Sequence, residues 1–387
     1  MSFLPALFRL GYSVSENPRT ISTLSVLAAL CLSAGAARAA ETTPANEFDL
    51  TRPEITAPGE KAPRIGAWSL NVDNDLLTGG GRDQDYTGGL ALAITGEGTR
   101  DWLFGLDRAR AGITRLTGLE RLFVNQNHVT RHSIEFGFTL FTPSDITIAE
   151  PIFNDHPYAS LFFVANAAQH VVPEKKLSYQ SVLTFGFLGL GLADSVQSGI
   201  HSVIGSDEPE GWDNQISDGG EPTARYSFSV AKTLIEGGGP GLTTQFSINS
   251  EASIGFTTDA SVGFGMRWGR LERPWHTFNP HPAEYISIGN PPDASTKTEK
   301  REAYLYAGIN LKARLYNAIL QGQFRDSEVT YDFDELNPIV AEGWAGFLTE
   351  LPAGYRFGLF IRARSAEIDV GEARSPVWGG FVVSRSL

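Results

Sequence analysis

Residues Glu302 to Leu315 read EAYLYAGINLKARL, and apolar side chains alternate with polar, aromatic or small ones along the whole stretch. One face would carry Leu305, Ala307, Ile309, Leu311 and Ala313, and the other Tyr304, Tyr306, Gly308, Asn310, Lys312 and Arg314. Successive side chains of a β-strand point to opposite faces, so this period of two predicts a strand with one apolar face. Tyr355 to Arg364 repeats the pattern with three arginines on one face. Cationic side chains opposite an apolar face suit the polar interior of a transmembrane β-barrel.

A soluble β-sandwich would show the same alternation, so the decision rests on other features. A signal peptide, the absence of cysteine after it, abundant glycine and aromatic residues, long strands and a chain that ends inside a strand all favour the barrel. We therefore predict an all-β, transmembrane antiparallel β-barrel over residues 64–387.

Twelve strands are predicted, and an even number fits a bacterial outer-membrane barrel, whose two ends meet on the same side. They cover residues 65–74, 87–96, 132–142, 158–170, 177–190, 223–235, 242–255, 258–269, 302–316, 337–349, 353–367 and 376–387. Short links such as 256–257 and 350–352 are predicted as periplasmic turns. Arginines facing inward predict a narrow or plugged lumen.

The first 63 residues are predicted to lie outside the fold. Residues 1–39 have the pattern of a cleaved signal peptide, with Arg9 and Arg19 before an apolar stretch and Ala37-Arg38-Ala39 at the expected cleavage site. Residues 40–63 read as a flexible leader. The single cysteine, Cys31, would be removed with the signal, which leaves neither disulfides nor a thiol nucleophile. Export by a signal peptide and a barrel together predict the outer membrane of a Gram-negative bacterium.

The charge balance excludes one class of partner. The formal net charge is -13, and removal of residues 1–39, with three Arg and one Glu, moves it to -15. An acidic surface does not suit nucleic acid, because phosphate binding needs a basic surface. After the signal, no apolar segment is long enough for a transmembrane helix.

One stretch predicts a helix instead of a strand. Leu192 to Gln215 reads LADSVQSGIHSVIGSDEPEGWDNQ, in which apolar residues recur at helical spacing. Gln197 and His201 lie four residues apart and therefore share one side of the helix. A histidine, an amide and the acidic Asp207 and Glu208 in one segment point to an active site. The alternative is an amphipathic loop helix whose polar face meets water.

A second polar group is predicted at the first hairpin. Its members, Asp73, Asn74, Asp75, Asp83, Asp85 and Thr87, converge at one rim of the barrel. Carboxylate, amide and hydroxyl oxygens are the ligands that Ca²⁺ prefers. The spacing is not that of an EF-hand loop. The alternative is that Asp, Asn and Gly simply form a good turn here.

Five blocks of sequence resemble one known family. They are Asn74-Asp75, Asp83-x-x-Tyr86-Thr87-x-Gly89, Phe141-Thr142-Pro143, Asp155-x-Pro157-Tyr158-Ala159, and Gln197-x-x-x-His201-x-x-Ile204-Gly205 with Gly211-Trp212-x-x-Gln215. In order and spacing they are similar to the LpxR family of outer-membrane lipid A 3'-O-deacylases. The resemblance spans essentially the whole chain after the signal.

The resemblance implies an active site between the barrel wall and the loop helix, in an enzyme that hydrolyses an acyl ester of lipid A or lipopolysaccharide with Ca²⁺. His201 would activate water, and Asp75 would orient His201 or stabilise its charge. Asn74, Thr87 and Gln197 match other site positions. Asp207 or Glu208, with Asp75, would lie near the metal. One departure concerns the lysine that the family carries after the Thr142-Pro143-Ser144 block, where this chain has Asp145-Ile-Thr-Ile148. A lysine contact to a lipid phosphate is therefore in doubt here.

The chemistry of the residues agrees with an esterase. A histidine titrates near neutral pH and can accept a proton from water, and a bound cation can stabilise an oxyanion. Ser198 also faces His201, which leaves a serine-based lipid esterase or phospholipase as one alternative, although no Gly-x-Ser-x-Gly elbow accompanies it. A non-enzymatic barrel, such as a porin, is the other. We favour water as the nucleophile.

Overall fold

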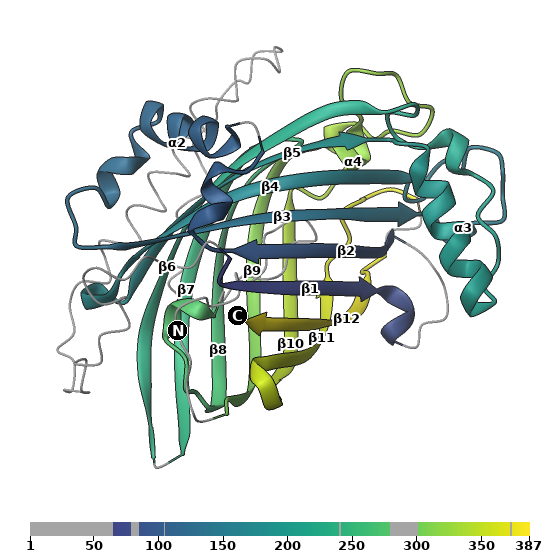
Figure 1. The fold of residues 1–387 in the computed structure, drawn as a ribbon. Coiled ribbons are helices and arrows are strands. Elements are labelled where there is room, and N and C mark those ends of the chain that lie inside the picture. The colour runs from purple at the N-terminus through teal and green to yellow at the C-terminus, as the bar shows by residue number, and fades with distance from the viewer. Residues whose placement is uncertain (1–64, 79–84, 104, 240, 279–300, 372–373) are drawn as a thin grey trace, which may run out of the picture.

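The computed structural model describes residues 65–78, 85–103, 105–239, 241–278, 301–371 and 374–387. The predicted signal peptide (residues 1–39), the leader (40–63) and Asp83 lie outside the described residues. Within them the chain forms a closed antiparallel barrel of twelve strands, in which each strand pairs with its neighbours in sequence and β1 pairs with β12 (Figure 1).

The strands are β1 (Ala67–Asn74), β2 (Asp85–Thr95), β3 (Val129–Thr142), β4 (Ala159–Val172), β5 (Leu177–Leu188), β6 (Glu221–Gly239), β7 (Leu242–Gly255), β8 (Thr257–Arg270), β9 (Ala303–Asn317), β10 (Ile339–Glu350), β11 (Tyr355–Arg364) and β12 (Val377–Ser386). The twelve-strand barrel prediction is confirmed. The helices are α2 (Leu106–Leu116), α3 (Leu192–Ile204) and α4 (Ala318–Gln321). Short 3-10 helices are η1 (Asp75–Thr78), η2 (Glu97–Asp101), η3 (Leu119–Leu122), η4 (Pro173–Lys175), η5 (Trp212–Asn214), η6 (Trp275–Thr277), η7 (Phe333–Glu335) and η8 (Pro352–Gly354).

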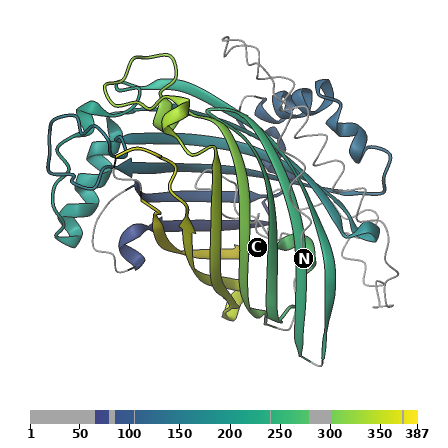
Figure 2. The ribbon, with the colours of Figure 1, turned by 180° about the vertical axis from the view of Figure 1, so that it is seen from behind.

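The barrel has two distinct rims. The first residue of β1 pairs with the last of β12, so both ends of the barrel domain lie on one rim, which we call the terminal rim. The opposite rim carries η1, the 143–158 loop and α3, and we call it the α3 rim; α2 lies at the other end of the molecule (Figures 1 and 2). The prediction that 256–257 and 350–352 are both periplasmic turns is wrong, because the first link lies on the α3 rim and the second on the terminal rim.

The predicted faces of the strands are confirmed on β9. Leu305, Ile309 and Leu311 are exposed on the outside of the barrel, whereas Asn310, Lys312 and Arg314 are buried in its interior. Apolar side chains toward lipid and polar ones inward are the pattern of a membrane barrel. Among the described residues, no helix is both long and apolar enough to cross a membrane.

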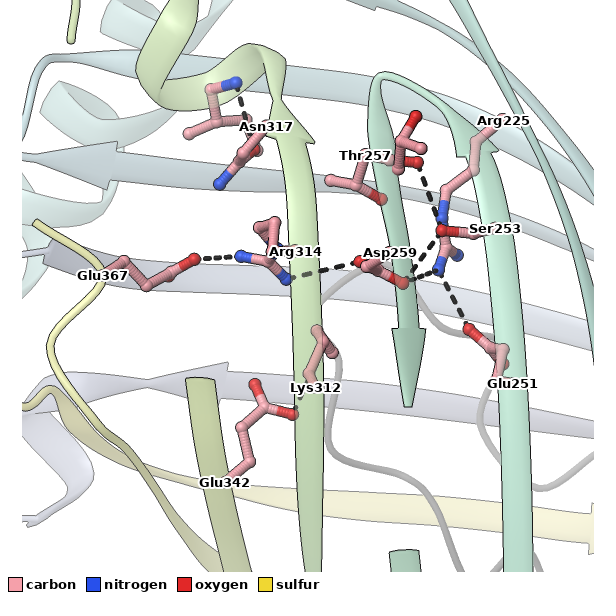
Figure 3. A network of polar contacts seen from close by, with 12 residues as sticks. Arg225, Glu251, Ser253, Thr257, Asp259, Lys312, Arg314, Asn317, Glu342 and Glu367 are labelled. Carbon is pink, nitrogen blue, oxygen red and sulfur yellow. Dashed lines mark hydrogen bonds and ion pairs between the residues drawn. The ribbon is translucent and has the colours of Figure 1, made fainter. Parts of the chain in front are cut away.

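Side chains fill the interior of the barrel. Near the α3 rim, Tyr86, Phe141, Leu161, Phe256 and Trp378 belong to one buried apolar cluster. Below it, ion pairs cross between strands, as Figure 3 shows. Asp259 lies 3.9 Å from Arg225 and 3.6 Å from Arg314, and Glu342 lies 2.7 Å from Arg364 and 3.7 Å from Lys312. The predicted plugged lumen agrees with this packing.

Candidate active site

The first part of the site lies where β1 ends and β2 begins, on the α3 rim. The Asn74 amide donates to the carbonyl oxygen of Thr87 at 2.7 Å, and the hydroxyls of Thr87 and Thr142 lie 2.6 Å apart. Asp75 follows directly as the first residue of η1 and is 7% exposed. The structure therefore brings Asn74, Asp75 and Thr87 together, as predicted, and ties them to the end of β3.

Asp73, the residue before Asn74, links two neighbouring strands of the barrel wall. It accepts a hydrogen bond of 2.7 Å from the Tyr86 hydroxyl. A side chain at Gly89 would place its Cβ 2.5 Å from that hydroxyl oxygen, so the contact needs a glycine there. Asp73 and Tyr86 thus fix the start of the hairpin that positions Asn74 and Asp75.

The second part of the site is α3, which carries His201 near its end. The helix stops at Gly205, which has a φ of 75° and donates its N–H to the His201 carbonyl at 2.8 Å. Glycine adopts this left-handed conformation without steric cost, so it is the expected helix terminator. The stop turns the chain back, so that the Asp207 carbonyl meets the His201 ring.

This contact sets the tautomer of His201. Nδ1 is hydrogen-bonded to the Asp207 carbonyl oxygen, which can only accept, so Nδ1 carries the proton. In the neutral ring Nε2 is then the acceptor atom, as a general base requires. The side chain is only 2% exposed, so it is held inside the protein and does not extend into water.

Gln197 lies one turn before His201 and is equally buried. Its Oε1 accepts a hydrogen bond of 2.8 Å from the Trp212 indole, whereas its Nε2 has no partner among the described residues. A buried donor without a partner is costly, and such groups are often completed by a ligand or water. Gln197 Nε2 is therefore a candidate donor to a substrate oxygen.

An apolar cluster fixes α3 and the Trp212 turn against the barrel. Its buried members are Leu140, Ile146, Tyr158, Ala193 and Trp212, and Phe138, Phe162 and Val196 pack on it. A Cβ at Gly211 would lie 2.5 Å from the Tyr158 ring, so glycine permits this close packing. Because Leu140 and Thr142 both belong to β3, the two parts of the site flank the end of the same strand.

Comparisons with known proteins agree with this arrangement. The model of the family described as "Outer membrane protein LpxR" matches residues 26–387. This chain belongs to the LpxR family. The structure of LpxR from Salmonella typhimurium superposes with a TM-score of 0.64 at 17% sequence identity and covers 83% of this chain and 100% of that one. The sequence matches no curated protein.

Other barrels resemble this LpxR-family chain much less. The β domain of the Bordetella autotransporter BrkA has 11% identity and a TM-score of 0.38, over 84% of this chain and 99% of that one. The KdgM porin has 5% identity and a TM-score of 0.34, over 83% of this chain and 99% of that one.

The three predicted metal ligands do not form one cluster in this LpxR-family chain. Asp75 is buried, whereas the side chains of Asp207 and Glu208 are exposed, and Asp207 meets His201 through its backbone carbonyl. Among the described residues, no group of three His, Cys, Asp or Glu side chains has the arrangement of a metal site. Asp75 with Asp207 or Glu208 as metal ligands therefore stays a prediction.

Where the resemblance to the family places a lysine, this chain has Asp145, whose side chain is hydrogen-bonded within its own loop. Asp145 accepts hydrogen bonds from the backbone and hydroxyl of Thr147, at 3.0 and 2.7 Å. The sequence has no Lys or Arg between Arg131 and Lys175, nor between Lys176 and Arg225. The 143–158 and 189–220 loops therefore supply no cation for a lipid phosphate.

The prediction missed an arginine at the α3 rim. Arg374 lies 3.1 Å from Asp85 and also pairs with Asp155, which accepts from the Ser144 backbone and hydroxyl. It thereby joins three segments of the rim. No local pattern in the sequence signals the contact, because Arg374 lies 289 residues from Asp85.

The Arg374 contact predicts a difference in acid sensitivity. Burial favours a higher pKa for Asp155, but hydrogen bonds from Arg374 and Ser144 hold the pKa below its ordinary value of 3.8. The stabilisation that ionised Asp155 contributes is thus complete above pH 3.8, and it is lost only as the pH falls through the lowered pKa. In Arg374→Ala, burial would dominate and raise that pKa. We expect cleavage of the 143–158 loop by a protease to accelerate from pH 7 to pH 5 in Arg374→Ala only.

Arg325→Ala is the matched control, since Arg325 lies on the same rim and donates to the Asp218 carbonyl. Equal acid sensitivity in both variants would contradict the role of Arg374.

Gln197 gives a second prediction. Gln197→Leu removes the acceptor of the buried Trp212 indole N–H, a loss that costs about 1–3 kcal/mol. We expect amide hydrogen exchange over residues 192–204 to become roughly ten- to a hundred-fold faster. Gln197→Glu keeps the oxygen acceptor and should change the exchange much less. Equal exchange in the leucine variant and the parent would show that the indole contact does not hold α3.

Proposed function

We propose that this chain is an outer-membrane lipid A deacylase that hydrolyses an acyl ester with water activated by His201. The observation that carries the proposal is the His201 ring, buried on α3 with Nδ1 hydrogen-bonded to the Asp207 carbonyl. Membership of the LpxR family and the barrel support an outer-membrane enzyme of this class. Following the family resemblance, the ester is that of the 3'-acyloxyacyl chain.

In the proposed reaction, Nε2 of His201 accepts a proton from water as the water oxygen attacks the ester carbonyl carbon. The bond between the acyl carbon and the sugar oxygen then breaks, which releases the fatty acid, and the same nitrogen returns the proton to the departing sugar alkoxide. Gln197 Nε2 would donate to the developing oxyanion, because it is a buried donor without a partner among the described residues. Asp75 would stabilise the positive charge that forms on the histidine, and Asn74 and Thr87 hold the hairpin that presents Asp75.

We also propose that the reaction depends on Ca²⁺, with Asp75 as the ligand on the barrel wall. The proposal follows from the family resemblance, whereas the exposed Asp207 and Glu208 give it no support from the described geometry. The ion would act in addition to the roles given above for His201, Gln197 and Asp75. Its role would be to polarise the ester carbonyl.

A serine nucleophile has less support. The Ser198 hydroxyl donates to Asp194 at 3.1 Å and the Ser202 hydroxyl donates to the Gly199 carbonyl at 2.8 Å, so each hydroxyl proton is directed to a group other than His201. A porin also has less support, since ion pairs and aromatic side chains occupy the barrel interior.

The test is mass spectrometry of lipid A from cells that express the protein or its His201→Ala variant, with Ca²⁺ or with a chelator. We expect loss of one acyloxyacyl mass that needs both His201 and Ca²⁺. If the acyloxyacyl mass is also lost in the presence of the chelator, the Ca²⁺ proposal is wrong and the hydrolase proposal stands. An unchanged profile, with the protein folded in the outer membrane, would overturn the lipid A assignment.

A further inference from the structure

The α2 helix packs on the outer surface of the barrel wall. Arg110 donates to Asn166 of β4 at 2.9 Å and to Ser181 of β5 at 2.5 Å. Val182, the neighbour of Ser181, belongs to the interior cluster, so Ser181 points outward. The helix therefore occupies a position that lipid would otherwise fill.

Buried contacts hold α2 in this place. Asp107 lies 2.7 Å from Arg110 and 3.3 Å from His132 of β3. Burial favours a higher pKa for Asp107, but the hydrogen bonds with His132 and Arg110 outweigh it and hold the pKa well below its ordinary value. After the helix, Leu119 and Phe123 pack into an apolar cluster with side chains of β5 and β6. The segment is a fixed part of the outer wall.

On β5, the exposed apolar surface of the barrel ends at this helix. On β5, Phe187 and Phe185 point outward and are each 40% exposed, whereas Ser181 and Tyr179, further along the same face, are buried beneath the α2 segment. Lipid-facing side chains therefore continue up to α2 from the α3 side. The exposed apolar face of β5 therefore ends at α2, which lies at the end of the molecule opposite α3 (Figures 1 and 2).

The free side of the segment combines apolar and cationic side chains. Leu116 is 89% exposed and Val124 is 54% exposed. Arg108, Arg115 and Arg121 are exposed around them, and Arg115 reaches Glu120 at 3.4 Å. This is a cationic surface on a chain whose formal net charge is -13. Arginine beside exposed leucine is the composition of a helix that lies at the boundary between lipid headgroups and acyl chains.

We propose that the 106–124 segment binds anionic phospholipids of the leaflet nearest the terminal rim. Leu116 and Val124 would enter the acyl boundary, and Arg108, Arg115 and Arg121 would contact the phosphates. The lipid-facing surface that ends at α2 and the opposite charges of arginine and phosphate both support this partner. The inference does not depend on the hydrolase activity.

The test uses a single environment-sensitive fluorophore. Cys31 is the only cysteine, so Leu116→Cys in a Cys31→Ser background gives one labelling position, and Glu328→Cys on the opposite rim gives an exposed control. The full barrel is placed in nanodiscs of phosphatidylcholine with increasing phosphatidylglycerol. We expect emission at position 116 to shift to shorter wavelength as phosphatidylglycerol increases, with quenching by spin-labelled lipid.

Arg108→Gln, Arg115→Gln and Arg121→Gln together should abolish the dependence on phosphatidylglycerol, with the barrel still folded. Emission at position 116 that matches the Glu328 position in every lipid would overturn the proposal. A shift that is equal in both lipids would also overturn it, because the contact would then be apolar without recognition of the anionic headgroup.

Discussion

His201→Ala is expected to lower the rate of lipid A acyl-ester hydrolysis by about 10²- to 10⁴-fold, the usual contribution of a general base. The ring is the one buried group on α3 whose tautomer, fixed by the Asp207 carbonyl, presents an acceptor nitrogen. Its removal should leave the barrel intact, because the β-strands do not depend on it. The measurement is the release of fatty acid by purified protein in mixed micelles, with folding checked by heat-modifiable migration in gels.

Ser198→Ala and Ser202→Ala are the matched controls, because both residues lie on the same helix as His201 and donate their hydroxyl protons within that helix. Each should retain a rate close to that of the parent. If Ser198→Ala loses as much activity as His201→Ala, the nucleophile is a serine and the water mechanism is wrong.

The second large effect is expected on stability. Glu342 lies inside the barrel between Arg364 at 2.7 Å and Lys312 at 3.7 Å, with each side chain 1% exposed. Removing one partner of a buried ion pair leaves a buried charge without compensation and costs about 3–5 kcal/mol. Glu342→Leu should therefore lower the free energy of unfolding by that amount, measured by urea unfolding in lipid vesicles.

Two further variants test the cause. Adding Lys312→Met removes the cation that lost Glu342 and should restore most of the loss, because well-packed apolar residues replace buried ion pairs at little cost. Lys176→Met breaks an ion pair of 2.7 Å with Glu236 whose side chains are about one-third exposed, and it should cost less than about 1 kcal/mol. Equal losses of unfolding free energy in Glu342→Leu and Lys176→Met would show that the buried ion pairs contribute no more to stability than an exposed one.

The strands could be predicted because alternation is local information. The membrane selects apolar side chains on one face and the packed interior selects polar ones on the other, so Leu305 and Lys312 reveal their positions without any knowledge of the fold. The helix around Gln197 and His201 could be predicted for the same reason, because its period differs from that of the strands. Asn74, Asp75 and Thr87 meet because one hairpin joins them.

The features that the sequence did not predict depend on contacts between segments that are far apart in the chain. Arg374 contacts Asp85 and Asp155 only when the barrel has closed, and no sequence pattern near Arg374 predicts these ion pairs. Helix α2 was not predicted, because its buried side is polar, with Asp107 and Arg110, and does not have the apolar pattern of a core face. The two short links were predicted on one side of the membrane, but length alone does not tell which rim a link occupies. The resemblance places Asp207 or Glu208 near a metal, and this placement stays a prediction.

The filled interior has a consequence for how the proposed enzyme meets its substrate. Among the described residues, ion pairs and aromatic rings occupy the lumen, and α3 packs on Phe138, Leu140 and Phe162 of the wall. A lipid would approach sideways, by lateral diffusion in its own leaflet. The turnover rate would then follow the mole fraction of that lipid in the membrane surface, and adding more vesicles of the same composition would leave it unchanged.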